Sequence, residues 1–419
     1  MNNDQNWTFL EKLVFRFSFS LLILFMFFFN NGTLPFLSII GGFIDSILHQ
    51  FIPWLAKSWH LSDEVSTKMN GSGDTTYHYM MLLFIGLIVP IVVLIWSLVD
   101  RKSKNYQPSY YWLTVCVRFY VGLMLINYGL VKVVQLQFPL PAFGRLLTTY
   151  GESSPMGLAW TFLGFSKGYN LFMGIAELMA GLLLFRRTVA IGAIITLMTT
   201  ANVMAVNYFY DVPVKIVSTA LVLMCLFLLL PNFKRLFKLF FIGEGTTLIA
   251  INPPIIKKRW KRNTKYTLKY LLIALMVLGG IFNVYTSYSK YGAGKPKSPL
   301  YGAYKVDKFI RGNKIVLAGD STYSPWQILI LQGIDNGAIK DANGLAYAEI
   351  TTDTVSKKIS FVFANDPDAK QELNYEKNGE RLILKGKFYG TDVNISLTKM
   401  KFQLIDRKLN WINETPYNR

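Results

Sequence analysis

Long apolar segments constrain the fold of this chain more than any other feature. A hydrocarbon core about 30 Å thick requires about 20 apolar residues in a helix that crosses it. The chain is 52% hydrophobic and 15% aromatic, which favours an α-helical polytopic membrane protein. We expect seven transmembrane helices, at residues 12–30, 79–99, 110–136, 169–185, 189–209, 212–231 and 267–287.

The positions of Lys and Arg predict the orientation of these spans. The formal net charge of +19 could indicate a nucleic-acid partner, but the basic residues gather in alternate loops, fifteen in one set and five in the other. Basic loops stay on the cytoplasmic side. We therefore expect a multi-pass protein of the cell (inner) membrane, with its N-terminus inside and everything after about residue 290 outside. The segment "KKRWKRN" (257–263) favours anionic lipid over RNA, and Arg16 is expected to snorkel to head groups.

The pattern divides the membrane part into consecutive regions. Residues 1–109 predict a two-helix hairpin with an outer amphipathic loop, whose helical pattern Pro53 should break into pieces. Residues 110–231 predict a four-helix transmembrane bundle. A basic cytoplasmic loop and the seventh helix follow at 232–289, and a Gly/Pro/Lys linker at 290–299.

The composition changes after the linker. Residues 300–419 contain short alternating runs separated by turn residues, and Asn378-Gly379 is a strong hairpin signal. We expect an antiparallel all-β domain of about eight or nine strands, a barrel or a sandwich, outside the membrane. This domain has no His and no Cys, which favours binding over catalysis.

The scarcity of Cys and His excludes several kinds of redox site. The only cysteines, Cys116 and Cys225, lie in separate apolar runs, so the chain has no CxxC pair. The three histidines do not form a haem or metal ligand set, and we expect no metal site. Redox chemistry would need a bound cofactor or electrons from another subunit, because no cofactor motif is encoded in the chain.

Polar residues recur at helical spacing inside two spans. Arg118, Gly122, Leu125, Gly129 and Lys132 fall on one face of the third span. The fourth span repeats the pattern with Asn170, Gly174, Glu177 and Gly181, so that Glu177 should face another helix across small residues. By helical rise, Lys132, Glu177 and Asn202 lie ~9, ~12 and ~10 Å below the outer ends of their helices.

These polar residues allow two interpretations, and the sequence leaves both open. Lys132 and Glu177 could form a buried ion pair that only locks the bundle. They could instead belong to an outward-facing polar pocket in which both are candidate catalytic groups, because intramembrane charges often mark sites. Arg118 lies nearer the inner face. The candidate pocket comprises Arg118, Tyr128, Lys132, Glu177, Asn202, Asn207, Tyr208, Asp211 and Lys215, with Tyr210 in its roof.

The segment from about 112 to 231 resembles the DoxX/DoxD-like membrane proteins. The resemblance rests on Arg118 near the start of one helix, Gly129-Leu-Val-Lys132 near its end, Glu177 and Gly181 in the next helix, and the basic turn Arg186-Arg187. It covers a little over a quarter of the chain and implies a four-helix bundle. DoxD-type members are similar to subunits of thiosulfate:quinone oxidoreductase, so the resemblance implies a quinone as a ligand.

Three functions agree with these features. The first is a quinone-linked redox component, in which Lys132 and Glu177 bind a quinone head group and exchange protons, and Asn202 positions it. The second is a non-catalytic membrane scaffold whose residues 300–419 bind a partner protein, such as a redox subunit or periplasmic protein, or a lipidic ligand. Transport of a small solute is the third, and the absence of an obvious inverted repeat disfavours it.

Overall fold

The computed structural model of the chain describes residues 6–68, 70–254, 256–312, 314–316, 325–364, 366–407 and 410–418. It contains two compact units. The helical unit comprises Met1–Gln137 and Gly168–Tyr285, and the barrel unit comprises Phe138–Lys167 and Thr286–Arg419. The segment between two helices of the first unit therefore belongs, by its contacts, to the second.

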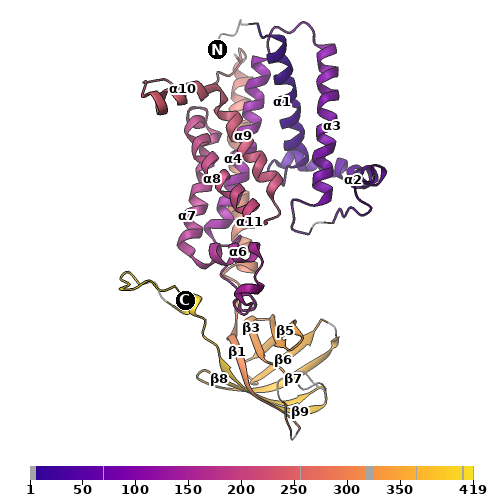
Figure 1. The fold of residues 1–419 in the computed structure, drawn as a ribbon, viewed down its shortest axis with the longest axis vertical. Helices are drawn as coiled ribbons and strands as arrows, with labels where there is room; N and C mark the ends of the chain where they lie inside the picture. Colours follow the sequence, from indigo (N-terminus) through magenta and orange to yellow (C-terminus); the bar gives the residue numbers. More distant parts are fainter. Residues whose placement is uncertain are drawn as a thin grey trace. The chain divides into compact units, whose positions relative to one another are not determined.

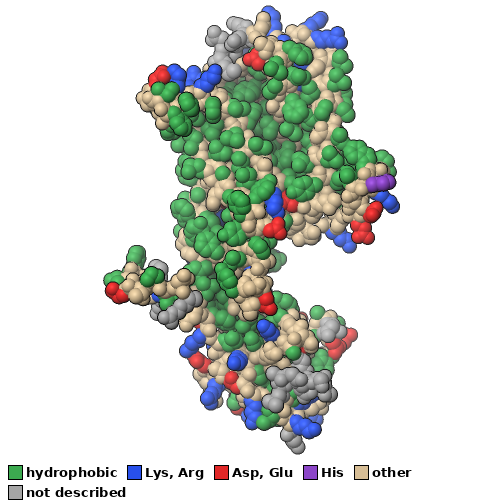
Figure 2. Space-filling model, in the orientation of Figure 1, with side chains coloured by type: hydrophobic (Ala, Val, Ile, Leu, Met, Phe, Trp, Pro, Cys, Tyr) green, Lys and Arg blue, Asp and Glu red, His purple; other side chains and the backbone are tan. Residues whose placement is uncertain are grey.

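The helical unit is a bundle in which the N-terminus and α10 lie at one end and α2 at the other (Figure 1). Hydrophobic side chains cover the visible sides of its helices, and Lys and Arg gather at the end that holds the N-terminus (Figure 2). Its α-helices are α1 (Phe9–Phe28), α2 (Pro35–Ser58), α3 (Thr76–Val99), α4 (Gln107–Val133), α7 (Lys167–Leu178), α8 (Val189–Phe209), α9 (Lys215–Leu229), α10 (Phe233–Phe237) and α11 (Arg259–Tyr291).

Among the described residues, five helices are long and apolar enough to cross a membrane: Thr76–Val99, Gln107–Val133, Arg186–Phe209, Lys215–Ile242 and Arg259–Tyr291. The expected count of seven stays a prediction. Helix α1 carries Glu11, Lys12 and Arg16 in its first half. Helix α7 has 12 residues, about 18 Å, before the chain tightens into the 3-10 helix η2 (Met179–Leu184).

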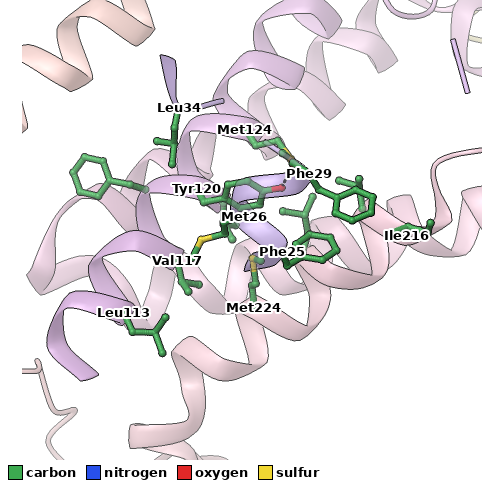
Figure 3. Close-up of a cluster of buried hydrophobic side chains, with 14 of the residues drawn as sticks. Phe25, Met26, Phe29, Leu34, Leu113, Val117, Tyr120, Met124, Ile216 and Met224 are labelled. Carbon is green, nitrogen blue, oxygen red and sulfur yellow. Dashed lines mark hydrogen bonds between the residues drawn. The ribbon is translucent and has the colours of Figure 1, made fainter. Parts of the chain in front are cut away.

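Part of the core of the helical unit lies where side chains of α1, α4 and α9 meet (Figure 3). Phe25 and Phe29 stack at 4.6 Å, beside Tyr120 of α4 and Met224 of α9 (Figure 3). Tyr120 is fully buried, and its hydroxyl donates a hydrogen bond of 2.5 Å to the carbonyl oxygen of Phe29. This bond satisfies one of the carbonyl groups that the end of α1 leaves without a helical partner.

The outer loop contains one long helix, so the predicted break at Pro53 is wrong. Helix α2 is continuous over 24 residues with Pro53 inside it. Proline removes one backbone hydrogen bond within a helix, but Ile52, Leu55 and Ala56 around it are at most 6% exposed and belong to the core of the unit. This packing holds the last turns of α2 together beyond the proline.

The barrel unit contains an antiparallel sheet of nine strands in the order β2-β1-β3-β4-β5-β6-β7-β8-β9. Pairing of β1 with β9 closes eight of these strands into a barrel, and the short β2 adds to β1. The predicted all-β domain is confirmed, as a barrel. Its strands are β1 (Lys297–Arg311), β2 (Lys314–Ile315), β3 (Ile328–Gly333), β4 (Gly337–Asp341), β5 (Gly344–Asp353), β6 (Lys358–Phe363), β7 (Asp366–Asn378), β8 (Arg381–Phe388) and β9 (Thr391–Lys399).

The hairpin predicted at Asn378-Gly379 is confirmed as the β7–β8 turn. Asn378 pairs with Arg381, which leaves Gly379 and Glu380 as the loop. Gly379 has a φ of +61°, a left-handed conformation that glycine adopts without a steric penalty. Asn378 is therefore the last residue of β7, and the two-residue loop begins at Gly379.

Large side chains fill the barrel interior. Tyr304, Leu329, Leu331 and Phe361 are at most 1% exposed and form its central core. A second, smaller cluster lies between the barrel and the segment 138–167, where Phe143 contacts Tyr301 and Phe402 at 5.0 and 5.7 Å. That segment contains α5 (Phe143–Leu146), the 3-10 helix η1 (Tyr150–Glu152) and α6 (Pro155–Phe165).

Candidate functional site

Lys132 of α4 and Glu177 of α7 meet directly inside the helical unit. The Lys132 Nζ atom lies 2.5 Å from Glu177 Oε1 and donates a hydrogen bond to it. The two residues are 4% and 2% exposed. The helical spacing of the polar and small residues in the sequence predicts that Lys132 and Glu177 lie on facing surfaces.

Small residues bring the two helices close enough for this pair to form. A Cβ atom on Gly129 would lie 2.8 Å from the Gly174 carbonyl oxygen, and a Cβ on Gly174 would lie 2.8 Å from that of Gly129. The backbones of α4 and α7 are therefore in direct contact one turn from Lys132 and Glu177. Gly181 is looser, with its nearest neighbour, Ile126 Cδ1, at 3.8 Å.

One further polar side chain lies near the pair, and another is buried on α7. The Lys132 Nζ atom is 5.7 Å from the centre of the Tyr128 ring, a cation–π distance. Asn170 is fully buried about two turns before Glu177 on α7, ~10 Å away along the helix axis. Among the described residues, no hydrogen bond reaches Glu177 Oε2, which is itself buried. The carboxylate therefore has one paired and one unpaired oxygen.

Four of the predicted pocket residues form a separate cluster at the α8–α9 connection. Lys215 pairs with Asp211 at 3.0 Å, Tyr208 contacts the Thr219 hydroxyl at 3.1 Å, and Asn207 donates to the Val214 carbonyl oxygen at 3.3 Å. The carboxylate of Asp74 accepts hydrogen bonds from the backbone N–H groups of Lys215 and Ile216, at 2.6 and 3.1 Å. These contacts hold a turn and the N-terminus of α9 in place. Tyr210, the other predicted roof residue, is exposed in this turn.

Asn202 and Arg118 do not join the Lys132–Glu177 pair through any hydrogen bond. Asn202 is exposed on α8 and makes no hydrogen bond to a described residue. Arg118 is buried, and its Nε atom donates to the Leu183 carbonyl oxygen at 2.7 Å, at the end of the 3-10 turn. The structure therefore divides the predicted pocket into the pair with Tyr128, the α8–α9 turn, and Arg118.

A buried network around Arg16 was not predicted. Arg16 is 4% exposed, and its guanidinium donates to the Tyr106 hydroxyl, the Ser97 hydroxyl and the Asp100 carbonyl oxygen at 2.6 to 3.0 Å. The expectation that Arg16 reaches lipid head groups is wrong, because protein acceptors surround it. Hydrogen bonds from the hydroxyl groups of Ser103 and Tyr106 hold the pKa of Asp100 below its usual value. The acceptors lie over 80 residues away along the chain, so no local pattern indicates them.

The barrel unit carries a cleft that was also not predicted. Its volume is about 470 Å³, and it lies between α5 and strands β3, β4 and β5. Arg145 lines it beside Gln332 and the 73% exposed ring of Tyr347. One terminal nitrogen of the Arg145 guanidinium is buried without a hydrogen-bond partner among the described residues.

Comparison with known proteins gives one family relationship. Over 126 residues the chain is 36% identical to "Uncharacterized protein YwoB" of Bacillus subtilis (strain 168), a match that covers 29% of this chain and 79% of YwoB. The chain belongs to the YwoB family. Since YwoB is described as uncharacterized, the family relationship brings no activity to this chain. No family model matches the sequence, and no solved structure matches it.

Proposed function

We propose that this protein is a membrane scaffold: a seven-span bundle of the cell membrane, with a DoxX-like unit at 112–231, that holds an extracytoplasmic barrel unit for binding a partner protein. The N-terminus is cytoplasmic in this proposal. The basic end of the helical unit and the five apolar helices support the membrane assignment. Helical spacing of Arg118, Lys132 and Glu177 supports the DoxX-like unit.

The closed contact between Lys132 and Glu177 carries the scaffold proposal. The charges neutralise each other at 2.5 Å, and both side chains are almost completely buried. Backbone contact at Gly129 and Gly174 fills the space next to them. A buried ion pair of this kind fixes the register of α4 against α7, because sliding one helix would separate the two charges. Setting a register is a structural use of buried polar groups.

The filled barrel interior supports partner binding on the outer surface rather than ligand binding inside the barrel. Trp326, Phe361 and Phe388 contact one another inside the barrel at ring distances of 5.1 to 6.0 Å, which leaves the interior packed like a core. The cleft beside α5 combines apolar side chains with Arg145 and an exposed Tyr347. Tyr and Arg are enriched in protein interfaces. Since Arg145 lines this cleft, a partner segment with a carboxylate would be attracted to its guanidinium.

Photo-crosslinking in living cells tests this proposal. A photoreactive phenylalanine at position 347 should give one discrete protein adduct, and Arg145→Gln in the same chain should reduce its yield at least about fivefold through loss of a charged interface contact. The matched control position is Tyr389, which is 47% exposed on the barrel and does not line the cleft. Equal adducts from both positions, or an adduct that Arg145→Gln leaves unchanged, would contradict partner binding in the cleft.

A quinone-linked redox component is the second candidate function. The observation that favours it is the unpaired Glu177 Oε2 atom, with Tyr128 nearby as a second polar group. In this role the Lys132–Glu177 pair would exchange a proton with an oxygen of the bound quinone, while another subunit supplies the electrons. Titration of purified protein with a soluble ubiquinone analogue separates the candidates: saturable binding that Glu177→Gln weakens supports the redox role, and its absence supports the scaffold.

A further inference from the structure

We propose that the helical unit contains a phosphate-binding pocket formed by Arg118, Arg186 and Arg187, and that its ligand is the head group of an anionic phospholipid. The pocket is a cavity of about 130 Å³ between the start of α4, the start of α8 and the segment 248–251. A cavity needs only about 10–15 Å³ to hold one water molecule. The space is therefore large enough for a small hydrated group.

Arg118 is the central observation. It is 5% exposed and lines the cavity, and its Nε atom donates to the Leu183 carbonyl oxygen at 2.7 Å. Its other guanidinium N–H groups make no hydrogen bond to a described residue. A buried guanidinium without an anionic partner is costly. Its free N–H groups match the paired oxygens of a phosphate.

The rest of the cavity has the charge that a phosphate requires. Arg186 and Arg187 line it, and none of the described lining residues is an acid. Lys265 adds a further positive charge beside the cavity, because its ammonium group donates a hydrogen bond of 3.0 Å to the hydroxyl of the lining residue Tyr111. Arg186 has one weak neutral contact, at 3.5 Å to the Asn252 amide oxygen. Arginine binds phosphate in a bidentate manner.

The wall opposite Arg118 is held in place by a side-chain amide. Asn232 accepts a hydrogen bond from the Ile249 N–H group at 2.7 Å and donates one to the Ile249 carbonyl oxygen at 3.0 Å. This pair of bonds fixes a segment without regular secondary structure against the helices. The cavity is thus a built part of the fold.

Apolar side chains at the same cavity favour a lipid over a soluble anion. Ile191 and Leu248 line it and are 50% and 43% exposed. A phospholipid would place its phosphate against the guanidinium groups and its acyl chains along these residues. Basic pockets between transmembrane helices are a known kind of site for anionic head groups.

Lipid titration of the purified full-length chain, followed by native mass spectrometry, tests the pocket. The probes are phosphatidylglycerol, phosphatidylcholine and inorganic phosphate. We expect retained phosphatidylglycerol, with an affinity roughly 20- to 30-fold weaker in R186Q/R187Q, from about fivefold for each basic residue. The matched control is R101Q/K102Q, which removes the same charge from exposed residues of the α3–α4 connection and should lower the affinity less than threefold.

Three results of this titration would contradict all or part of the proposal. Equal losses in the two double variants would show attraction by general charge and overturn the pocket, as would failure to retain phosphatidylglycerol. Binding of inorganic phosphate at the affinity of the lipid would keep the phosphate site but overturn the lipid as its source. Arg118→Gln should weaken lipid binding by about fivefold. If this buried change prevents folding, the comparison of R186Q/R187Q with R101Q/K102Q still tests the pocket.

Discussion

At the scale of single residues, the Lys132–Glu177 pair gives the clearest stability prediction. Lys132→Met leaves a buried carboxylate without its cation and should cost about 3–5 kcal/mol in the free energy of unfolding. K132M/E177M removes both charges and should recover most of this loss, because desolvation of the pair is no longer needed. Unfolding of the detergent-solubilised chain, monitored by circular dichroism, measures both values. A double variant as unstable as Lys132→Met would contradict the role of the pair as a lock.

Asp100 gives a prediction for pH. Hydrogen bonds from Ser103 and Tyr106, together with the charge of Arg16, lower the pKa of Asp100 in the folded chain. A carboxyl group with a lowered folded pKa stabilises the fold above its unfolded pKa, about 3.9, and this stabilisation is lost as the pH falls through the folded pKa. Wild type should therefore unfold at a higher temperature than Asp100→Asn at pH 6.

The same comparison under acidic conditions supplies the check. Near pH 3 the difference between wild type and Asp100→Asn should shrink, since the carboxyl group is then increasingly protonated in both states. Asp353→Asn is the control, because hydrogen bonds from Ser356 and Val355 also lower the pKa of Asp353, but at the exposed end of β5 in the barrel unit. An unchanged difference from pH 6 to pH 3 would mean that the charge of Asp100 does not stabilise the Arg16 network.

At the scale of elements, the α4–α7 contact depends on two glycines. Gly174→Ala places a Cβ atom 2.8 Å from the Gly129 carbonyl oxygen, so the helices must separate. We expect a loss of about 1–3 kcal/mol in the free energy of unfolding, as for other overpacked contacts. Gly181→Ala is the control on the same face, with an ordinary contact at 3.8 Å, and should be nearly neutral. Similar losses in the two variants would contradict a tight crossing at Gly174.

The contact between these two helices could be predicted because helical spacing is a local property. Steps of three and four residues placed Lys132 and Glu177 on facing surfaces, and the structure joins them. Asn202 shows the limit of this reasoning: its depth matches theirs, but its helix turns the side chain outward. Arg118 shows another, since its acceptor at Leu183 belongs to the end of a 3-10 helix that begins at Met179. No proline marks that transition in the sequence, and Gly181 within it fits a helix-packing contact equally well.

At the scale of the whole molecule, the division into units does not follow the order of the chain. The segment 138–167 connects two helices of the helical unit, yet it packs with the barrel through Phe143, Leu146 and Leu147. Its apolar residues are spread among Pro, Gly and Thr, so no period indicates a partner, and the barrel residues that it contacts are over 130 positions away. The barrel unit is thus built from two separate parts of the chain, Phe138–Lys167 and Thr286–Arg419.

Phe143 should control the packing of this segment against the barrel. It is 6% exposed and lies against the rings of Tyr301 and Phe402. Phe143→Ala should weaken docking of the segment by about 3–5 kcal/mol, the usual cost of removing a buried phenylalanine. Hydrogen–deuterium exchange of the full chain should then be faster at 143–149, while strands β5 to β8 keep their protection because the interior of the barrel is unchanged.

Phe162→Ala, at a position 65% exposed in the same segment, is the control. Exchange at 143–149 that is the same in wild type and Phe143→Ala would mean that this contact does not maintain the cleft beside α5.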